Sequence, residues 1–282
     1  MKSDKRFFTY DEQIDALKSK GCEITDEEFC QKSLSNIGYF RLKAYYLPFK
    51  LKDGTYQEGF SFTTVSRLYD FDCNLRSWLF PIIETIEVSI RARLVYFHSE
   101  NYGPLGYLDA DSFNKHHNHA DFLEKIEQLK EQYDKLLFVK HYNEQHEGVF
   151  PLWVISELFT FGMTSRFYCD LKTSDKKRFA GTDYELMVSW LRCCSDLRNI
   201  CAHHGRIYYR VFTAMPAGFN IDQSAARRFW GAVLSVKALY PYSNQWNNEL
   251  VPILVALIDE FKNDINLYHL AFPKDWESQL RK

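Results

Sequence analysis

Apolar residues recur at helical spacing through most of this chain. The longest such stretch runs from Thr63 to about Ser99. Its apolar positions are Leu68, Leu75, Leu79, Ile82, Ile86, Ile90 and Leu94. Steps of three and four residues place such side chains on one face of an α-helix. Pro81 lies inside the stretch, and we expect it to kink or divide the helix because proline lacks an amide hydrogen.

Shorter helices are indicated by capping signals, in which Thr is followed three residues later by Glu. Thr9 with Glu12 predicts a helix over 13–20, and Thr25 with Glu28 predicts a second helix. Further helices are expected at 35–46, 120–145, 151–160, 163–171, 223–239 and 249–267. A turn at 52–55 is expected to join a short hairpin with 56–62. The chain is therefore predicted to be all-α, with a small N-terminal helical subdomain (1–60) packed on a larger helical bundle (61–282).

A further helix, opened by the capping box Thr182 to Glu185, is predicted to extend past Trp190 as far as Arg210. One side of it is apolar: Trp190, Cys194, Leu197, Cys201, His204 and Tyr208. The neighbouring side is polar: Arg192, Asp196, Asn199, His203, Arg206 and Arg210. Residues three and four apart share a helix face. We therefore expect His203 on the polar face and His204 as a packed, hydrogen-bonded histidine.

The chemistry of this helix is concentrated between Arg198 and Arg206. An arginine stabilises charge that develops on a phosphate, and an imidazole carries protons near neutral pH. These are the groups needed to cleave RNA without a metal ion. The candidate catalytic residues are Arg198, Asn199 and His203, and the candidate RNA-binding residues are Arg192, Arg206 and Arg210.

Arg198 and His203 are five residues apart, which on a straight helix separates their directions by roughly 140°. One helix therefore does not aim both side chains at the same phosphate. Either the turn before Gly205 is distorted, or a second copy of the chain completes the site across a two-fold axis. In the second case the homodimer is part of the chemistry.

Glu84, Glu87 and Arg91 share one face of the long helix. Two interpretations remain open for Glu87. It forms a surface ion pair with Arg91, or it supports the site by orienting Arg198 or His203. The surrounding sequence is too apolar for a fully solvated helix, so the second interpretation stands beside the first. The candidate supporting residues are His204, Glu87 and Arg91.

Other kinds of site are not indicated. The histidines at 116, 117 and 119 have none of the usual zinc spacings, so we expect a solvated loop and no metal site. No glycine loop for phosphate and no serine nucleophile elbow is present, and no cofactor is expected.

The amino-acid composition excludes some kinds of protein and indicates where this one acts. The aromatic content of 17% excludes a disordered chain, and the net charge of −2 means that any RNA binding must depend on local basic clusters. Seven cysteines without a CxxC pair indicate a reducing compartment. The run Met1 to Arg6 leads into no signal core, and no apolar stretch of about 18 residues is present. We expect a cytoplasmic protein without membrane contact.

Several segments together resemble a known family. They are Ile37-Gly38-Tyr39-Phe40-Arg41-Leu42 with Ala44-Tyr45, Phe71-Asp72 with Leu75-Arg76, Ile86-Glu87-Val88-Ser89-Ile90-Arg91, Pro151-Leu152-Trp153, Phe161-Gly162, and Leu197-Arg198-Asn199 with Cys201-Ala202-His203-His204-Gly205-Arg206. In these segments the chain resembles the bacterial Abi-like proteins of the AbiD/AbiF abortive-infection group, which carry a HEPN ribonuclease domain. The resemblance covers most of the chain.

The resemblance implies a HEPN-type helical bundle that dimerises to form a composite RNA-cleaving site, as in the paired HEPN domains of type VI CRISPR effectors. It implies that Arg198 and His203 are catalytic, with Asn199 as a polar orienter and His204 within the motif. The implied reaction is attack by the ribose 2′-hydroxyl, leaving a 2′,3′-cyclic phosphate. Two alternatives remain open: a non-catalytic HEPN module that binds RNA or a partner, and a ribonuclease held inactive by a bound small RNA or an antitoxin.

Overall fold

The computed structural model describes residues 6–281, and all the regular elements in this range are helices. The expectation of an all-α protein is confirmed. The charged run that begins at Met1 falls mainly in residues 1–5, outside the described range. The α-helices are α1 (Tyr10–Lys18), α2 (Glu27–Ile37), α3 (Tyr39–Tyr46), α4 (Phe62–Tyr102), α5 (His119–Gln132), α6 (Leu137–Gln145), α7 (Leu152–Ile155), α8 (Phe161–Asp170), α9 (Thr173–Ala180), α10 (Leu186–Ala202), α11 (Gln223–Ala226), α12 (Phe229–Leu239), α13 (Ser243–Gln245), α14 (Val251–Glu260) and α15 (Trp276–Arg281).

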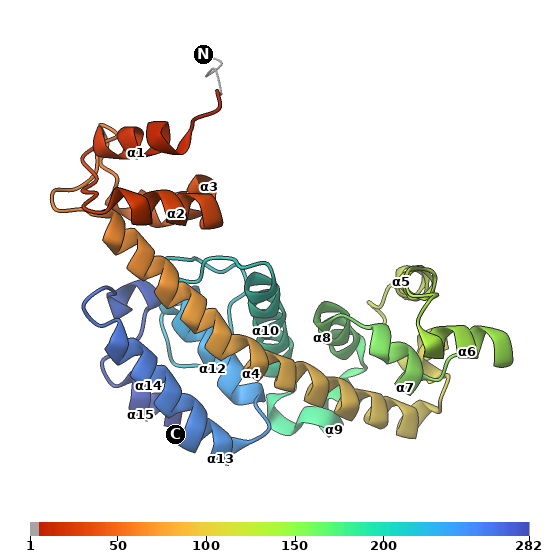
Figure 1. The fold of residues 1–282 in the computed structure, drawn as a ribbon. Helices are drawn as coiled ribbons and strands as arrows, with labels where there is room; N and C mark the ends of the chain where they lie inside the picture. Colours follow the sequence, from red (N-terminus) through yellow and green to blue (C-terminus); the bar gives the residue numbers. More distant parts are fainter. Residues whose placement is uncertain (1–5, 282) are drawn as a thin grey trace.

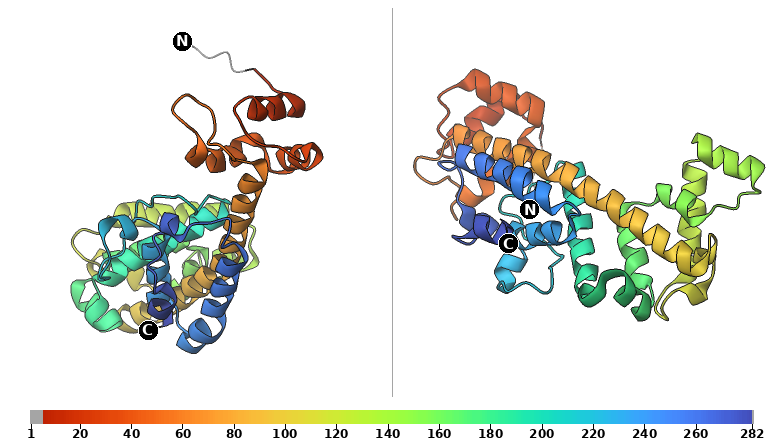
Figure 2. Two further views of the ribbon diagram at one scale, coloured as in Figure 1. Left: turned by 90° about the vertical axis from the view of Figure 1, so that its left-hand side faces the viewer. Right: turned by 90° about the horizontal axis from the view of Figure 1, so that it is seen from below.

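Helix α4 is the axis of the molecule (Figure 1). Its 41 residues begin after the N-cap Ser61, whose hydroxyl accepts a hydrogen bond from the Thr64 amide. Helices α1–α3 lie at its N-terminal end, and the group α5–α7 lies at its C-terminal end (Figures 1 and 2). Helices α10, α12 and α14 pack along its middle. The apolar residues predicted at helical spacing over 63–99 thus form the buried face of one long helix.

Pro81 was expected to kink or divide the helix, and the division is wrong, because α4 continues through it. Proline removes one amide donor, which leaves the carbonyl of Ser77 without its helical partner. Both Ser77 and Pro81 are exposed, so water can hydrate that carbonyl. The apolar residues on the opposite side remain in register with the core.

The N-terminal helices follow their capping signals with one difference. Thr9 and Glu12 form the expected capping box at the start of α1. Asp26, one residue after the expected Thr25, caps α2. The single helix expected over 35–46 is wrong, because Gly38 has φ of 89° and separates α2 from α3.

Other helix predictions need correction, among them the single helix over 223–239, which is the two helices α11 and α12. The charged segment 120–145 is two helices, α5 and α6, separated after Gln132. The capping box at Thr182 is absent: residues 181–183 form a short 3-10 turn, and α10 begins at Leu186. The C-terminal segment starts with a π turn over 246–250, and Pro252 falls in the first turn of α14, where a missing amide is tolerated.

Buried residues from Ile14 in α1 to Leu280 in α15 belong to one continuous hydrophobic core. The division at residue 60 therefore remains a prediction about organisation. No helix within residues 6–281 combines the length and hydrophobicity that a membrane span requires.

Candidate functional site

Helix α10 carries Arg198 and ends at Ala202, just before the two histidines. His203 is the C-cap, and His204 has φ of 53°. The His204 amide donates to the Cys201 carbonyl at 3.1 Å, and the Gly205 amide donates to the Ile200 carbonyl at 2.7 Å. This pair of hydrogen bonds is a Schellman motif, in which the left-handed position usually belongs to glycine. Here the left-handed position belongs to His204.

The early end of α10 overturns the expected pattern beyond residue 202. His204 is exposed, so the prediction of a packed, hydrogen-bonded imidazole is wrong. Tyr208 is buried as expected, but it reaches the core from a loop. Arg206 also leaves the polar stripe. The backbone is helical as far as Ala202, and His203 is the C-cap with φ of −95° and ψ of 16°. The helix therefore sets the direction of His203 relative to Arg198 only up to the preceding residue.

Asp72 of α4 holds the backbone of the loop that follows the motif. Its carboxylate is fully buried. Oδ2 accepts hydrogen bonds from the Tyr45 hydroxyl at 2.7 Å and the Ile207 amide at 2.9 Å. Oδ1 accepts one from the Tyr208 amide at 2.8 Å. Burial raises the pKa of Asp72 above its ordinary value, and these hydrogen bonds act in the opposite direction because they favour the charged carboxylate.

Two arginines hold carbonyls of the same loop. Arg76 Nη1 donates to the Gly205 carbonyl at 3.1 Å and lies 3.4 Å from the Asp72 carboxylate. Arg41 Nη1 of α3 donates to the His204 carbonyl at 3.0 Å. We refer to Arg41, Tyr45, Asp72 and Arg76 as the loop clamp. It fixes the turn that presents His203 and His204.

Arg206 faces the N-terminal helices instead of solvent. Its guanidinium donates to the Ala44 carbonyl and lies 5.9 Å from the ring centroids of both Tyr45 and Tyr209. Burial lowers the pKa of Arg206 from its ordinary value. The expected RNA-binding role for this arginine is therefore not supported by its position, because its charge is engaged inside the fold.

Glu87 meets Arg198 across the contact between α4 and α10. The Arg198 Nε lies 3.5 Å from Glu87 Oε2, and Glu87 is buried. Burial raises the pKa of Glu87, while the charges of Arg198 and Arg91 act to lower it. Arg91 itself donates to the Ser156 carbonyl at 3.3 Å. The geometry therefore favours the interpretation of Glu87 as an orienting residue for Arg198 over a surface pair with Arg91.

The remaining candidate residues lie at the surface around the end of α10. Arg192, Asn199, His203 and Arg210 are exposed. Asn199 Oδ1 accepts a 3.4 Å hydrogen bond from Arg198 Nη1, as expected of an orienter. Asn199 and Arg210 also line a small cavity of about 230 Å³. Arg198 is thus held by an acid on one side and an amide on the other.

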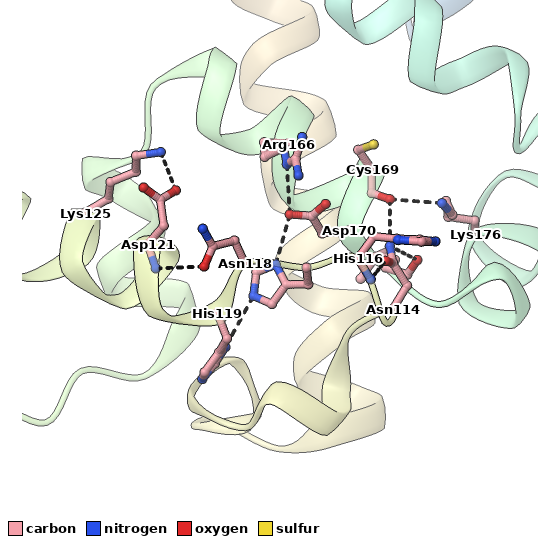
Figure 3. Close-up of polar contacts among 12 residues, drawn as sticks. Asn114, His116, Asn118, His119, Asp121, Lys125, Arg166, Cys169, Asp170 and Lys176 are labelled. Atoms are coloured by element: carbon pink, nitrogen blue, oxygen red, sulfur yellow. Dashed lines mark hydrogen bonds and ion pairs between the residues drawn. The ribbon is translucent and has the colours of Figure 1, made fainter.

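The histidine loop at 116–119 is only partly the solvated loop that its sequence predicts, because His116 and Asn118 are exposed whereas His117 and His119 are partly buried (Figure 3). The His117 side chain is 4% exposed, and its ring stacks on Phe113 with centroids 4.0 Å apart. Its Nδ1 lies 2.9 Å from Asp170 Oδ2, and its Nε2 lies 3.3 Å from His119 Nδ1. Arg166 contacts the same carboxylate oxygen at 3.0 Å. Within residues 6–281, no group of three or more His, Cys, Asp or Glu side chains is arranged to hold a metal ion.

Sequence reasoning missed the loop clamp as a functional unit. Its members come from α3 and α4, and they contact residues more than 120 positions later in the chain. One signal was present, because Arg41, Asp72 and Arg76 all lie in segments that carry the family resemblance. The structure brings those segments together around the turn after α10.

Comparison with known proteins gives one match. Residues 32–209 match the family model for Abi-like proteins. No curated protein and no solved structure matched the chain. The matched region contains the loop clamp, Glu87, Arg198 and both motif histidines, and it spans more than half of the 282 residues. The chain therefore belongs to the Abi-like protein family, which is associated with abortive infection in defence against phage.

Proposed function

We propose that this protein is a HEPN endoribonuclease that acts in abortive infection by cleaving RNA without a metal ion. One observation carries the proposal: Arg198 is paired with buried Glu87, while His203 lies exposed at the end of the same helix. A fixed cation and an accessible imidazole are suited to phosphodiester cleavage.

In the proposed reaction, His203 takes the proton of a ribose 2′-hydroxyl. The 2′-oxygen then attacks the adjacent phosphorus, and the bond from phosphorus to the 5′-oxygen breaks. Arg198 stabilises the extra negative charge of the transition state, and a second histidine donates a proton to the leaving oxygen. The products are a 2′,3′-cyclic phosphate and a 5′-hydroxyl. One positioned acid or base typically contributes about 10²–10⁴ in rate.

In this proposal, each site takes His203 from one copy of the chain and Arg198 from a second copy. Positions five apart along an ideal helix differ in direction by roughly 140°, and His203 directly follows the last residue of α10. We therefore expect that Arg198 and His203 of one chain do not face one phosphate. A two-fold axis that places two α10 termini face to face supplies both groups. Mixing Arg198→Ala chains with His203→Ala chains tests this arrangement, and we expect the mixture to recover activity that neither variant has alone. A monomer that cleaves at full rate contradicts it.

Product chemistry tests the reaction itself. Purified protein is incubated with a short RNA in EDTA, and the product ends are identified by mass spectrometry. We expect cleavage with cyclic phosphate ends, and no cleavage of DNA or of RNA methylated at the 2′-oxygen. Loss of cleavage in EDTA, restored by Mg²⁺, contradicts the proposed mechanism.

Two other outcomes are informative. Tight RNA binding without cleavage identifies a non-catalytic HEPN module. A small RNA that copurifies with the protein, and whose removal releases activity, identifies a ribonuclease under RNA control.

A further inference from the structure

A cavity of about 750 Å³ lies between the C-terminal half of α4 and the segment 152–158. Residues from both elements line it: Val88, Arg91, Tyr96, Glu100, Trp153 and Glu157. A volume of this size is typical of sites that hold a small organic group. The cavity is thus a candidate binding site next to the residues described above.

Two aromatic side chains are exposed around this cavity. Trp153 is 50% exposed and Tyr96 is 70% exposed, and they come from different elements. Val88 adds an exposed aliphatic side chain on α4. Folded proteins usually bury tryptophan, so an exposed pair of aromatic residues in a concave site indicates a surface that a ligand covers.

The position of the cavity follows from the order of contacts along α4. Arg76 meets Gly205, Glu87 meets Arg198, and Arg91 meets the segment at Ser156. At 1.5 Å per residue, Glu87 lies about 16 Å beyond Arg76, and Arg91 lies a further 6 Å along. The lining of the cavity therefore begins at Val88, the residue that follows Glu87 on α4.

We propose that this cavity binds an unstacked nucleobase of the RNA strand whose phosphate contacts Arg198. The inference rests on the proposed ribonuclease function and adds a subsite to it. Proteins that read single-stranded RNA commonly stack splayed bases on aromatic rings or on arginine planes. Trp153 and Tyr96 supply the rings, and Arg91 lies between Glu87 and Tyr96 along α4.

Charge favours a base over a phosphate inside the cavity. Glu100 and Glu157 place two carboxylates at its lining, which repel a phosphate. Arg91 contributes a cation, but its guanidinium is already hydrogen bonded to the carbonyls of Ser156 and Glu157. An uncharged base is not repelled by these carboxylates and does not need the Arg91 charge. The phosphate of the same nucleotide strand stays at Arg198.

The test uses the full-length protein and a short RNA with one mapped cleavage site. An abasic nucleotide is placed in turn at each position flanking the cut, and kcat/KM is measured for the wild type, Trp153→Ala and Trp153→Phe. Loss of one stacked base lowers affinity by about 5- to 100-fold. We expect the wild type to lose at least fivefold for one abasic position. Trp153→Ala should lose a similar factor on the intact RNA but little more on the abasic RNA, and Trp153→Phe should resemble the wild type.

A matched control removes another exposed aromatic residue. Tyr268 is 79% exposed and lies near the C-terminus, so Tyr268→Ala should leave kcat/KM unchanged. If the wild type cleaves and no abasic position affects it, or if Trp153→Ala cleaves like the wild type, the base subsite is wrong. If Trp153→Ala converts a dimer to a monomer, a second copy of the chain occupies the cavity and the proposal is also overturned.

Binding separates this inference from the ribonuclease proposal. RNA methylated at every 2′-oxygen is titrated against the wild type and Trp153→Ala. Weaker binding by at least fivefold in the variant supports the subsite even if no preparation cleaves RNA. Equal binding overturns it even if the wild type proves to be a ribonuclease.

Discussion

The backbone and the reactive side chains of the α10 terminus are held in opposite ways. The backbone from His204 to Tyr208 is bound at two carbonyls and two amides by the loop clamp. Arg198 has two weak polar contacts, at 3.4 and 3.5 Å, and His203 lies exposed beyond it. The difference indicates that the fold fixes where the motif is and leaves its charged groups able to contact a substrate.

The first way to test this contrast is to remove the reactive side chains. Arg198→Ala and His203→Ala should each lower the rate of RNA cleavage by about 10²–10⁴. Thermal unfolding should change little, because truncation of an exposed His203 leaves no core cavity. Lys262→Ala is a surface control, because Lys262 is an exposed basic residue outside the motif, and it should retain most of the activity. A His203→Ala variant with the wild-type rate contradicts the assignment.

Removing a member of the loop clamp should instead lower the stability of the fold. Asp72→Ala leaves the Ile207 and Tyr208 amides and the Arg76 charge without their buried acceptor, and we expect a loss of about 3–5 kcal/mol in unfolding free energy. Urea denaturation measures the change. Asp72→Asn keeps one acceptor oxygen and should be less affected. Wild-type stability in Asp72→Ala would show that the loop is held by other contacts.

Glu87 shares properties with both groups of residues: it is buried like the loop clamp, but it contacts the reactive side chain of Arg198. Glu87→Gln removes the charge opposite Arg198 while it keeps the side-chain shape. We expect kcat to fall by about tenfold, the scale on which a supporting residue acts. KM should change little, because Glu87 is buried. Glu84→Gln, on an exposed position of the same helix, is the control. Equal effects of the two substitutions would mean that Glu87 does not orient Arg198.

The smallest expected effect concerns His204. Its left-handed backbone costs about 1 kcal/mol relative to glycine. His204→Gly should therefore raise the unfolding free energy by up to about that amount. Calorimetry is the measurement. Destabilisation by this substitution would indicate that the imidazole makes contacts that matter to the fold.

Helical periodicity predicted much of the fold but not the details of the site. Residues 63–99 are one helix because their repeating apolar positions pack on the core, whereas Pro81 was expected to interrupt them. The end of α10 was missed because a helical wheel carries no information about where a helix stops. Gly205 follows the left-handed residue instead of occupying that position, so the usual C-terminal glycine signal was displaced by one residue.

Contacts between residues distant in sequence explain the wrong predictions for Arg206 and His117. The burial of Arg206 depends on the N-terminal helices, and that of His117 depends on Phe113 and Asp170. Neither environment is visible in a local pattern. The pairing of Glu87 with Arg198 was one of two interpretations that the sequence left open, and only the arrangement of α4 against α10 distinguished them.

The loop clamp also has a consequence for the order of events during translation. Asp72 meets Ile207 across 135 positions of sequence, and Arg41 meets His204 across 163. The N-terminal partners leave the ribosome first, so their contacts form only after most of the chain has been synthesised. A nascent or truncated chain that ends before Tyr208 cannot complete the turn at His203. For a protein proposed to cleave RNA inside the cell that makes it, incomplete products are therefore expected to be harmless.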